Sequence, residues 1–417
     1  MRIEILNTGS ELLLGKTINT HAAWFGRELF KLGLRIARQT TVPDGEAIRE
    51  AITESLGRTD VLIVTGGLGP TSDDLTREIT AEVLGLELIL DEAALRSLEN
   101  FFALRGRPMA EANRKQAYAP VGADVLPNPN GTAPGVYIPP RLNGSSNCAV
   151  FLLPGPPREL YPMVHAEVVP RLLALSGVET PPALLELKFT GIGESDFHQG
   201  IDAQLEQIPG LEYGYCAHIG EVDLRLIGSP TALERGRSIA LEKFQSFLIS
   251  DDGSSLEQTV VRLLTEKRMT LATAESCTGG LIGHRLTNVP GASAVFTHGF
   301  ITYANAAKIS LLGVSPADLE TCGAVSETVA CQMAAGALRA SGADIAVAVT
   351  GIAGPDGGTP EKPVGTAWIG LAGKDLPAAA FKVFHPRNRH DFKLAVSQAA
   401  LEAVRRKMVL SGNSPGK

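Results

Sequence analysis

A serine that follows a predicted β-strand is the first residue of this sequence that could do covalent chemistry. The β-rich run 270–274 leads directly into ESCTGG (275–280), after which a helical pattern begins. A strand-to-helix turn would expose Ser276, and the backbone amides after it could bind an oxyanion or a phosphate. The same residues could form an ordinary serine helix cap beside a glycine turn, so both interpretations stay open.

A serine nucleophile needs a base that takes its proton. Lys308 follows a second predicted strand, and its alanine neighbours would permit the desolvation that lowers the pKa of a lysine. A solvated surface lysine is the alternative interpretation. His284, on the predicted helix after the turn, and His298, on the second strand, are the other candidate bases, and Cys277 is a rival nucleophile.

Glycine-rich segments follow two further predicted strands. TGIAGPDGG (350–358) closes a buried strand, and TGGLGPTSDD (65–74) joins the apolar run 61–64 to a helical pattern. Such segments can hold phosphate on backbone amides, although a purely structural turn is the alternative for the first of them. Asp73 and Asp74 add hard oxygen ligands that suit Mg²⁺ or Mn²⁺ beside a diphosphate, but aspartates in a first helical turn also simply cap the helix.

The elements that would position these segments form two α/β patterns. Over residues 1–175 buried strands alternate with helices, which predicts a parallel sheet covered on both faces, with ligand loops at the carboxyl ends of its strands. TGSE (8–11) and LPGPPRE (153–159) also lie at such ends, where Arg158 could bind a phosphate or be a surface charge. The linker DDGSS (251–255) precedes the second α/β pattern.

Residues 181–248 follow a different, α+β pattern. The turn GIGE (191–194) resembles the GXXG loop of KH nucleic-acid modules, but the segment has few basic residues, which favours a structural spacer. The sequence therefore predicts an α/β protein with two separate α/β domains, at 1–175 and 253–417, joined by a small α+β KH-like unit at 176–252.

Composition limits the classes of function. The 417 residues are 44% hydrophobic and 20% charged, as in a globular protein of more than one domain. The formal charge of -7 argues against a nucleic-acid-binding surface. Five scattered cysteines without a CxxC pair indicate reduced thiols, and no signal peptide or membrane span is expected, so we expect a cytoplasmic location.

Four motifs in the second half together resemble the CinA family: AESCTGG (274–280), FITYANAAK (300–308), GAVSE (323–327) and VTGIAGPDGG (349–358). Residues 254–410 are similar to the free-standing nicotinamide mononucleotide deamidases called PncC. The resemblance implies hydrolysis of the nicotinamide amide to nicotinic acid mononucleotide and ammonia, by a serine–lysine mechanism without a metal or other cofactor. It makes Ser276 the nucleophile, Lys308 the base and Tyr303 part of the proton relay. It also implies that Arg389 binds the phosphate of the substrate. The other substrate contacts that it implies are Glu275, Thr278, Gly279, Gly280, Thr350 and Gly351.

Three motifs in the first half, TGSELLLG (8–15), GGLGPTSDD (66–74) and LPGPPREL (153–160), resemble the molybdopterin-binding MoaB/MogA-like domain that begins CinA proteins. In those proteins this half is associated with metal-dependent hydrolysis of ADP-ribose to AMP and ribose 5-phosphate. The resemblance implies a divalent metal (Mg, Mn or Co, with or without K) at Asp73 and Asp74. The other ligand contacts that we expect are Glu11, Asn19, Gly66, Gly67, Gly69, Thr71 and Arg158.

The whole sequence therefore predicts a bifunctional enzyme of pyridine-nucleotide recycling, with nicotinamide mononucleotide and ADP-ribose as its small-molecule partners and a homodimer as its assembly. Two alternatives stay open. The first half could be a pterin-binding or adenylating module that hydrolyses nothing. The whole chain could be a competence factor that binds nucleic acid, although its net negative charge argues against this.

Overall fold

The computed structural model describes residues 1–142, 147–177, 183–374 and 376–410. Contacts between Cα atoms divide the chain into two compact units, Met1–Pro182 and Ala183–Lys417, and each is described by itself. The second unit contains both the small α+β segment and the second α/β domain. None of the described helices is long and apolar enough to cross a membrane.

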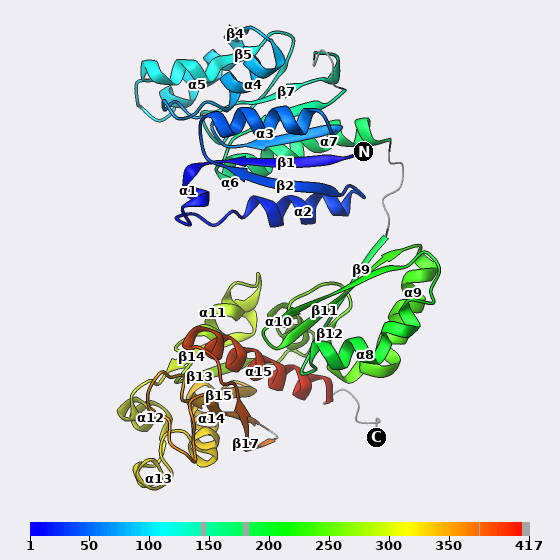
Figure 1. The fold of residues 1–417 in the computed structure, drawn as a ribbon. Helices are drawn as coiled ribbons and strands as arrows, with labels where there is room; N and C mark the ends of the chain where they lie inside the picture. Colours follow the sequence, from blue (N-terminus) through cyan, green and yellow to red (C-terminus); the bar gives the residue numbers. More distant parts are fainter. Residues whose placement is uncertain (143–146, 178–182, 375, 411–417) are drawn as a thin grey trace. The chain divides into compact units, whose positions relative to one another are not determined.

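The first unit is built on a six-stranded sheet with the strand order β2-β1-β3-β8-β7-β6 (Figure 1). The first four strands pair in parallel, whereas β7 and β6 pair antiparallel at one edge, so the sheet is mixed rather than wholly parallel as expected. The edge strands are only three and four residues long, too short for a strand to be recognised from the sequence pattern. The six strands are β1 Ile3–Thr8, β2 Ile36–Val42, β3 Val61–Thr65, β6 Asp124–Leu126, β7 Gly135–Ile138 and β8 Ala149–Leu153.

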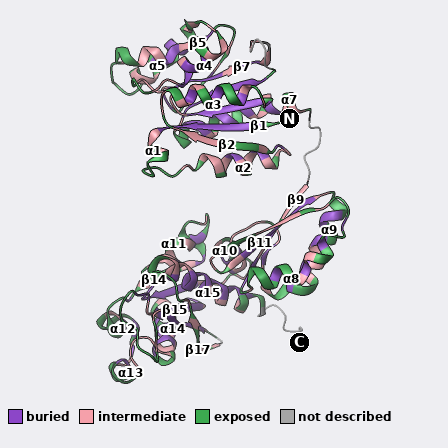
Figure 2. Cartoon of the chain, in the orientation of Figure 1, coloured by how far each residue is buried: buried purple, intermediate pink, exposed green. Residues whose placement is uncertain are grey.

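Helices cover both faces of this sheet, as the buried strands predicted (Figures 1 and 2). Successive residues of a strand point to opposite faces, so Ile63 packs in the cluster with α2 and α6, whereas Leu62 and Val64 pack in the cluster with α3 and α4. The helices are α1 Ser10–Leu13, α2 His21–Lys31, α3 Glu46–Leu56, α4 Thr76–Leu84, α5 Glu92–Ala103, α6 Pro157–Met163 and α7 Val169–Ser176. A small two-stranded sheet is formed by β4 Leu88–Leu90 and β5 Tyr118–Pro120.

The α+β segment at the start of the second unit has one four-stranded antiparallel sheet with the order β10-β11-β9-β12. Its element order, strand-helix-strand-strand-helix-strand, is the split βαβ, ferredoxin-like arrangement. The GIGE turn joins β9 to α8, and the KH-like character of this segment stays a prediction. Helix α9 ends at Phe244, which leaves room for a last short strand before the linker. The elements are β9 Ala183–Thr190, α8 Glu194–Leu205, β10 Glu212–His218, β11 Glu221–Gly228, α9 Pro230–Phe244 and β12 Leu248–Ser250.

The second α/β domain has a five-stranded sheet with the order β14-β13-β15-β16-β17. Strand β13 lies between β14 and β15 and is parallel to both, whereas β16 and β17 are antiparallel. Strand β17 was not predicted. The strands are β13 Leu271–Glu275, β14 Phe296–Ile301, β15 Ile345–Gly351, β16 Thr366–Gly373 and β17 Leu376–Phe384.

The helices of this domain also lie on both faces of its sheet. Val347 and Val349 of β15 pack in the cluster with α10, α11 and α15, and the intervening Ala348 packs in the cluster with α14. Ser255 and Ser326 cap α10 and α14 through their hydroxyl groups. The helices are α10 Leu256–Lys267, α11 Leu281–Thr287, α12 Asn305–Leu312, α13 Pro316–Thr321, α14 Glu327–Ser341 and α15 Arg389–Leu410.

Candidate functional sites

Ser276 lies directly after β13, where the chain turns toward α11. Its backbone N–H donates to the carbonyl of Val349 on β15 at 3.0 Å, and the carbonyl of the preceding Glu275 accepts from the N–H of Thr302 at 2.8 Å. The turn is therefore fixed to the segments on both sides of β13. The Ser276 side chain lines a small cavity and is 9% exposed.

Lys308, in the first turns of α12, brings its amine to this serine. The Lys308 Nζ lies 3.1 Å from Ser276 Oγ, 2.9 Å from the Thr302 carbonyl oxygen and 3.2 Å from the Tyr303 carbonyl oxygen. The side chain is 1% exposed, and all three of these partners are uncharged. Burial lowers the pKa of the Lys308 amine because desolvation penalises its charged form.

The environment suits a neutral amine. An uncharged amine has two N–H donors and one lone pair, so the two carbonyl groups can accept both N–H bonds while the lone pair faces the Ser276 hydroxyl. Lys308 would then accept the serine proton along a contact that already exists. The expectation of a buried base beside Ser276 therefore agrees with the geometry, and the solvated-surface alternative for Lys308 is wrong.

The rival groups are placed less favourably. Burial raises the pKa of the Cys277 thiol to about 12, so it stays protonated at neutral pH. His284 faces Asn288 on the exposed side of α11, with 3.2 Å between its Nε2 and the Asn288 amide nitrogen. His298 is exposed on β14 and stacks on Phe300. Among the described residues, neither histidine lines the cavity around Ser276.

The cavity has a volume of about 190 Å³ and a charged wall. Arg389 donates to the Gly354 carbonyl at 2.9 Å and to the Tyr303 hydroxyl at 2.7 Å, so the arginine and tyrosine that were predicted from separate motifs meet here. Thr350 also lines the cavity, with its hydroxyl donating to the Ala324 carbonyl at 2.8 Å. The full lining is Ser276, Cys277, Tyr303, Asn305, Lys308, Ala324, Val325, Thr350, Gly351, Ala353 and Arg389.

Four predicted substrate contacts do not line this cavity: Glu275, Thr278, Gly279 and Gly280. Glu275 and Thr278 are buried, and the backbone N–H of Gly280 donates to the Glu275 carboxylate at 3.0 Å. The N–H of Gly279 donates to the Ser276 carbonyl. The expected contacts of Gly279 and Gly280 with the substrate are therefore corrected, because internal acceptors occupy these two glycine amides.

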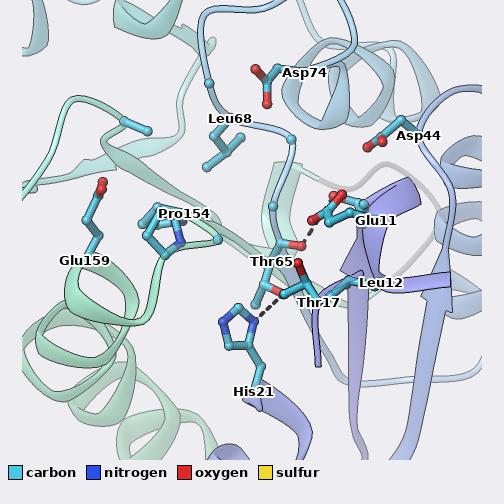
Figure 3. A pocket seen from close by; sticks show the side chains of 18 of the residues that line it. Glu11, Leu12, Thr17, His21, Asp44, Thr65, Leu68, Asp74, Pro154 and Glu159 are labelled. Carbon is cyan, nitrogen blue, oxygen red and sulfur yellow. Dashed lines mark hydrogen bonds between the residues drawn. The ribbon is translucent and has the colours of Figure 1, made fainter. Parts of the chain in front are cut away.

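A second, larger cavity lies in the first unit, at the carboxyl ends of β1, β3 and β8 (Figure 3). Its volume is about 490 Å³. Gly66 and Gly67 follow β3 with φ of 100° and 66°, and a Cβ on Gly67 would lie only 2.1 Å from Thr76 Oγ1. Glycine is required there because only it fits both the left-handed backbone and the close approach to α4.

Carboxylates surround this cavity (Figure 3). Asp74 accepts from the Thr71 N–H at 3.0 Å and from its hydroxyl. The nearby Thr71 side chain also favours the charged form of Asp73 and lowers its pKa. Asp44 accepts from the Ser10 N–H at 3.0 Å. Within the described part of the chain, no three His, Cys, Asp or Glu side chains gather closely enough to hold a metal by themselves.

Models of two protein families match this chain. The CinA C-terminal domain matches residues 253–408, and the "Probable molybdopterin binding domain" matches residues 4–174. A "CinA-like protein" of Akkermansia muciniphila is 50% identical over 405 residues, which are 97% of each chain. The chain belongs to the CinA family.

Other CinA-family proteins agree with this assignment. A "Putative competence-damage inducible protein" of Symbiobacterium thermophilum is 50% identical over 90% of this chain and 89% of its own. A crystal structure of the competence/damage inducible protein CihA from Agrobacterium tumefaciens is 40% identical, covers 39% of this chain and 98% of its own, and has a TM-score of 0.35. The two family models and the two relatives that span most of the chain confirm the resemblance seen in the motifs for both halves.

In this CinA chain the cavity of the first unit differs in one position from the expected site. Arg158 is exposed at the start of α6, 3.7 Å from Glu159, and does not line the cavity, so its expected phosphate contact is corrected. Glu159 does line it and accepts from the Asn128 amide at 2.8 Å. The other expected residues line it: Glu11, Asn19, Gly66, Gly67, Gly69, Thr71, Asp73 and Asp74.

Sequence reasoning missed several lining residues of the cavity in the first unit, among them His21, Asp44, Gln116 and Glu159. His21 lies 3.3 Å from the Thr65 hydroxyl, and burial lowers the pKa of its ring. Asp44 follows β2, and Glu159 is adjacent to the predicted Arg158. The signal that could have found both is their position at a strand's carboxyl end.

Proposed function

We propose that the C-terminal domain hydrolyses the amide of nicotinamide mononucleotide to nicotinic acid mononucleotide and ammonia. The observation that carries the proposal is the 3.1 Å contact between Ser276 Oγ and Lys308 Nζ, made where the amine is buried. A nucleophile within hydrogen-bond reach of its base is the arrangement that covalent catalysis needs. Membership of the CinA family and the PncC-like motifs supply the choice of substrate.

The reaction would proceed in two halves. Lys308 takes the proton of Ser276 as Oγ forms a bond to the amide carbon, and the same amine then gives that proton to the departing nitrogen, which leaves as ammonia. Water, deprotonated by the free Lys308 amine, attacks the acyl-serine, and Ser276 regains its proton as the carboxylic acid leaves. Arg389 carries the positive charge in the cavity and would hold the phosphate. Tyr303, whose hydroxyl accepts a hydrogen bond from Arg389, would assist the proton relay.

Ammonia release from nicotinamide mononucleotide tests this proposal. The purified full chain should release ammonia at the same rate with and without a chelator, because no step uses a metal. Ser276→Ala should release none while keeping the melting temperature of the wild type. Full activity of that variant would contradict the assignment of the nucleophile.

For the N-terminal domain we propose metal-dependent hydrolysis of ADP-ribose to AMP and ribose 5-phosphate. Support comes from the glycine-lined cavity at the strand ends and from its carboxylate oxygens, which are the donors that Mg²⁺ or Mn²⁺ prefers. The described side chains fit a cation that is coordinated partly by the protein and partly by a bound diphosphate, as is common for Mg²⁺. They do not fit a cation that is held by protein ligands alone. Asp73 and Asp74 would hold it, and the bound cation would offset negative charge on the diphosphate.

The second candidate for this domain is a pterin-binding module that hydrolyses nothing, which the match to a molybdopterin binding domain favours. AMP release from ADP-ribose separates the two. Chelator-sensitive AMP release supports the pyrophosphatase, whereas molybdopterin binding without AMP release under any of Mg²⁺, Mn²⁺ or Co²⁺, with or without K⁺, supports the module.

A further inference from the structure

We propose that Glu275 is a positioning residue of the deamidase, one that fixes the nucleophile turn from inside the domain. Its side chain is 1% exposed, and its carboxylate accepts four hydrogen bonds from residues after Ser276. One oxygen accepts from the Thr278 hydroxyl at 2.7 Å, the Gly280 N–H at 3.0 Å and the Ile282 N–H at 3.1 Å. The other accepts from the Gly283 N–H at 2.9 Å.

These bonds determine the path of the chain around the nucleophile. Gly279 and Gly280 have φ of 62° and 97°, which allows residues 278–283 to curl around a single carboxylate. Backbone amides at the start of a helix have no partners within that helix, and here Glu275 satisfies three of them. Ser276 lies inside the loop that the carboxylate closes, so its backbone cannot shift without breaking these bonds.

Glu275 also connects the nucleophile to the base. Its carbonyl accepts from the N–H of Thr302 at 2.8 Å, and the carbonyl of Thr302 accepts from Lys308 Nζ at 2.9 Å. The backbone of one residue thus holds the segment that aims the amine, while its side chain holds the turn that carries the hydroxyl. A shift of either segment would lengthen the contact between Ser276 and Lys308.

The carboxylate does not line the substrate cavity, which separates this role from the substrate contact first expected. A residue that acts only by positioning the reacting groups should change kcat and leave KM nearly constant. A substrate contact should instead change KM. The proposal rests on the proposed amide hydrolysis, so its test also needs a measurement that does not use the substrate.

The test compares Glu275→Gln with wild type and with a matched control, Glu257→Gln. Glu257 also binds the helix after the turn, through Arg285 at 2.8 Å, but does not contact the turn itself. The glutamine in Glu275→Gln keeps the shape of the side chain, removes its charge and places a donor against at least one N–H. Since a hydrogen bond to a charged group is worth about 1.5–3 kcal/mol, we expect kcat for ammonia release to fall about 10- to 100-fold.

KM should stay within about threefold of wild type, because the carboxylate does not line the substrate cavity. Amide hydrogen exchange of the 276–287 segment should become faster in Glu275→Gln and stay at the wild-type rate in Glu257→Gln. If Glu275→Gln fails to fold, Thr278→Val, which removes one donor to the carboxylate, should show a smaller fall in kcat of the same kind.

Three results would separate the explanations. A raised KM with unchanged kcat would overturn the proposal and restore a substrate contact. Wild-type kcat together with wild-type exchange in Glu275→Gln would also overturn it. If the wild-type chain releases no ammonia, the proposed function fails. Amide hydrogen exchange still tests the structural role of Glu275 in that case: faster exchange in Glu275→Gln would support the role, and unchanged exchange would overturn it.

Discussion

Replacing Lys308 by methionine should abolish the deamidase and reveal whether Lys308 and Ser276 act as one unit. A positioned general base contributes about 10²- to 10⁴-fold to rate, which corresponds to roughly 3–5 kcal/mol. Among the described residues, Lys308 is the only lysine or histidine that lines this cavity, so no other base of these types is placed to replace it. Methionine keeps the apolar stem and removes the amine.

The loss of kcat in the double variant shows whether the two residues act as one unit. Ser276 and Lys308 share one proton across 3.1 Å, so losing either group removes the same step. If each single variant lowers kcat about 10³-fold, independent effects would give about 10⁶-fold in Ser276→Ala/Lys308→Met, whereas a coupled pair gives about the same loss as one variant alone. The assay is ammonia release under single-turnover conditions. Additive losses, or a wild-type rate in Lys308→Met, would refute the pair.

The pH dependence gives an independent check of the same base. Burial lowers the pKa of Lys308, so kcat/KM should rise about tenfold per pH unit and level off below the ordinary lysine pKa of about 10.4. Unfolded chains keep the ordinary value, so between the two pKa values the unfolded state binds more protons and stability should increase with pH. Lys308→Met should lose this contribution, as measured by urea unfolding across the alkaline range. A wild-type pH profile that falls through this range would contradict an amine base.

Three further predictions concern single positions. Asp73→Asn should remove chelator-sensitive AMP release from ADP-ribose and leave ammonia release unchanged, and loss of both activities would indicate misfolding instead. Gly67→Ala should destabilise the first unit by about 2–5 kcal/mol in thermal unfolding, because its left-handed φ and the 2.1 Å approach to Thr76 both oppose a methyl group. Gly85→Ala, with a similar φ and open space, should cost only about 1 kcal/mol, so equal losses would contradict the steric argument. Arg389→Met should raise KM for nicotinamide mononucleotide about 10- to 100-fold but not for nicotinamide riboside, which lacks the phosphate, and an equal rise for both would place the phosphate elsewhere.

Local patterns determined much of this protein. The apolar strand at 61–64, the helix at 256–267 and the Ser326 cap were predictable because each depends on residues within a few positions of one another. Strands β12 and β17 were not predictable, since each is short or half exposed and becomes a strand by pairing with a partner distant in sequence. The same limit hid the antiparallel edge of the first sheet.

The candidate active site likewise depends partly on local sequence and partly on tertiary structure. Residue types could nominate Ser276 and Lys308 separately, but only the parallel pairing of β13 with β14 brings two residues 32 positions apart within 3.1 Å. The family resemblance also made Glu275 a substrate contact, like its neighbours in the same motif. Neighbouring side chains at the end of a strand point to opposite faces of the sheet. The tertiary structure decides what lies on each face: Ser276 meets Lys308 of α12, whereas the Glu275 carboxylate meets the start of α11.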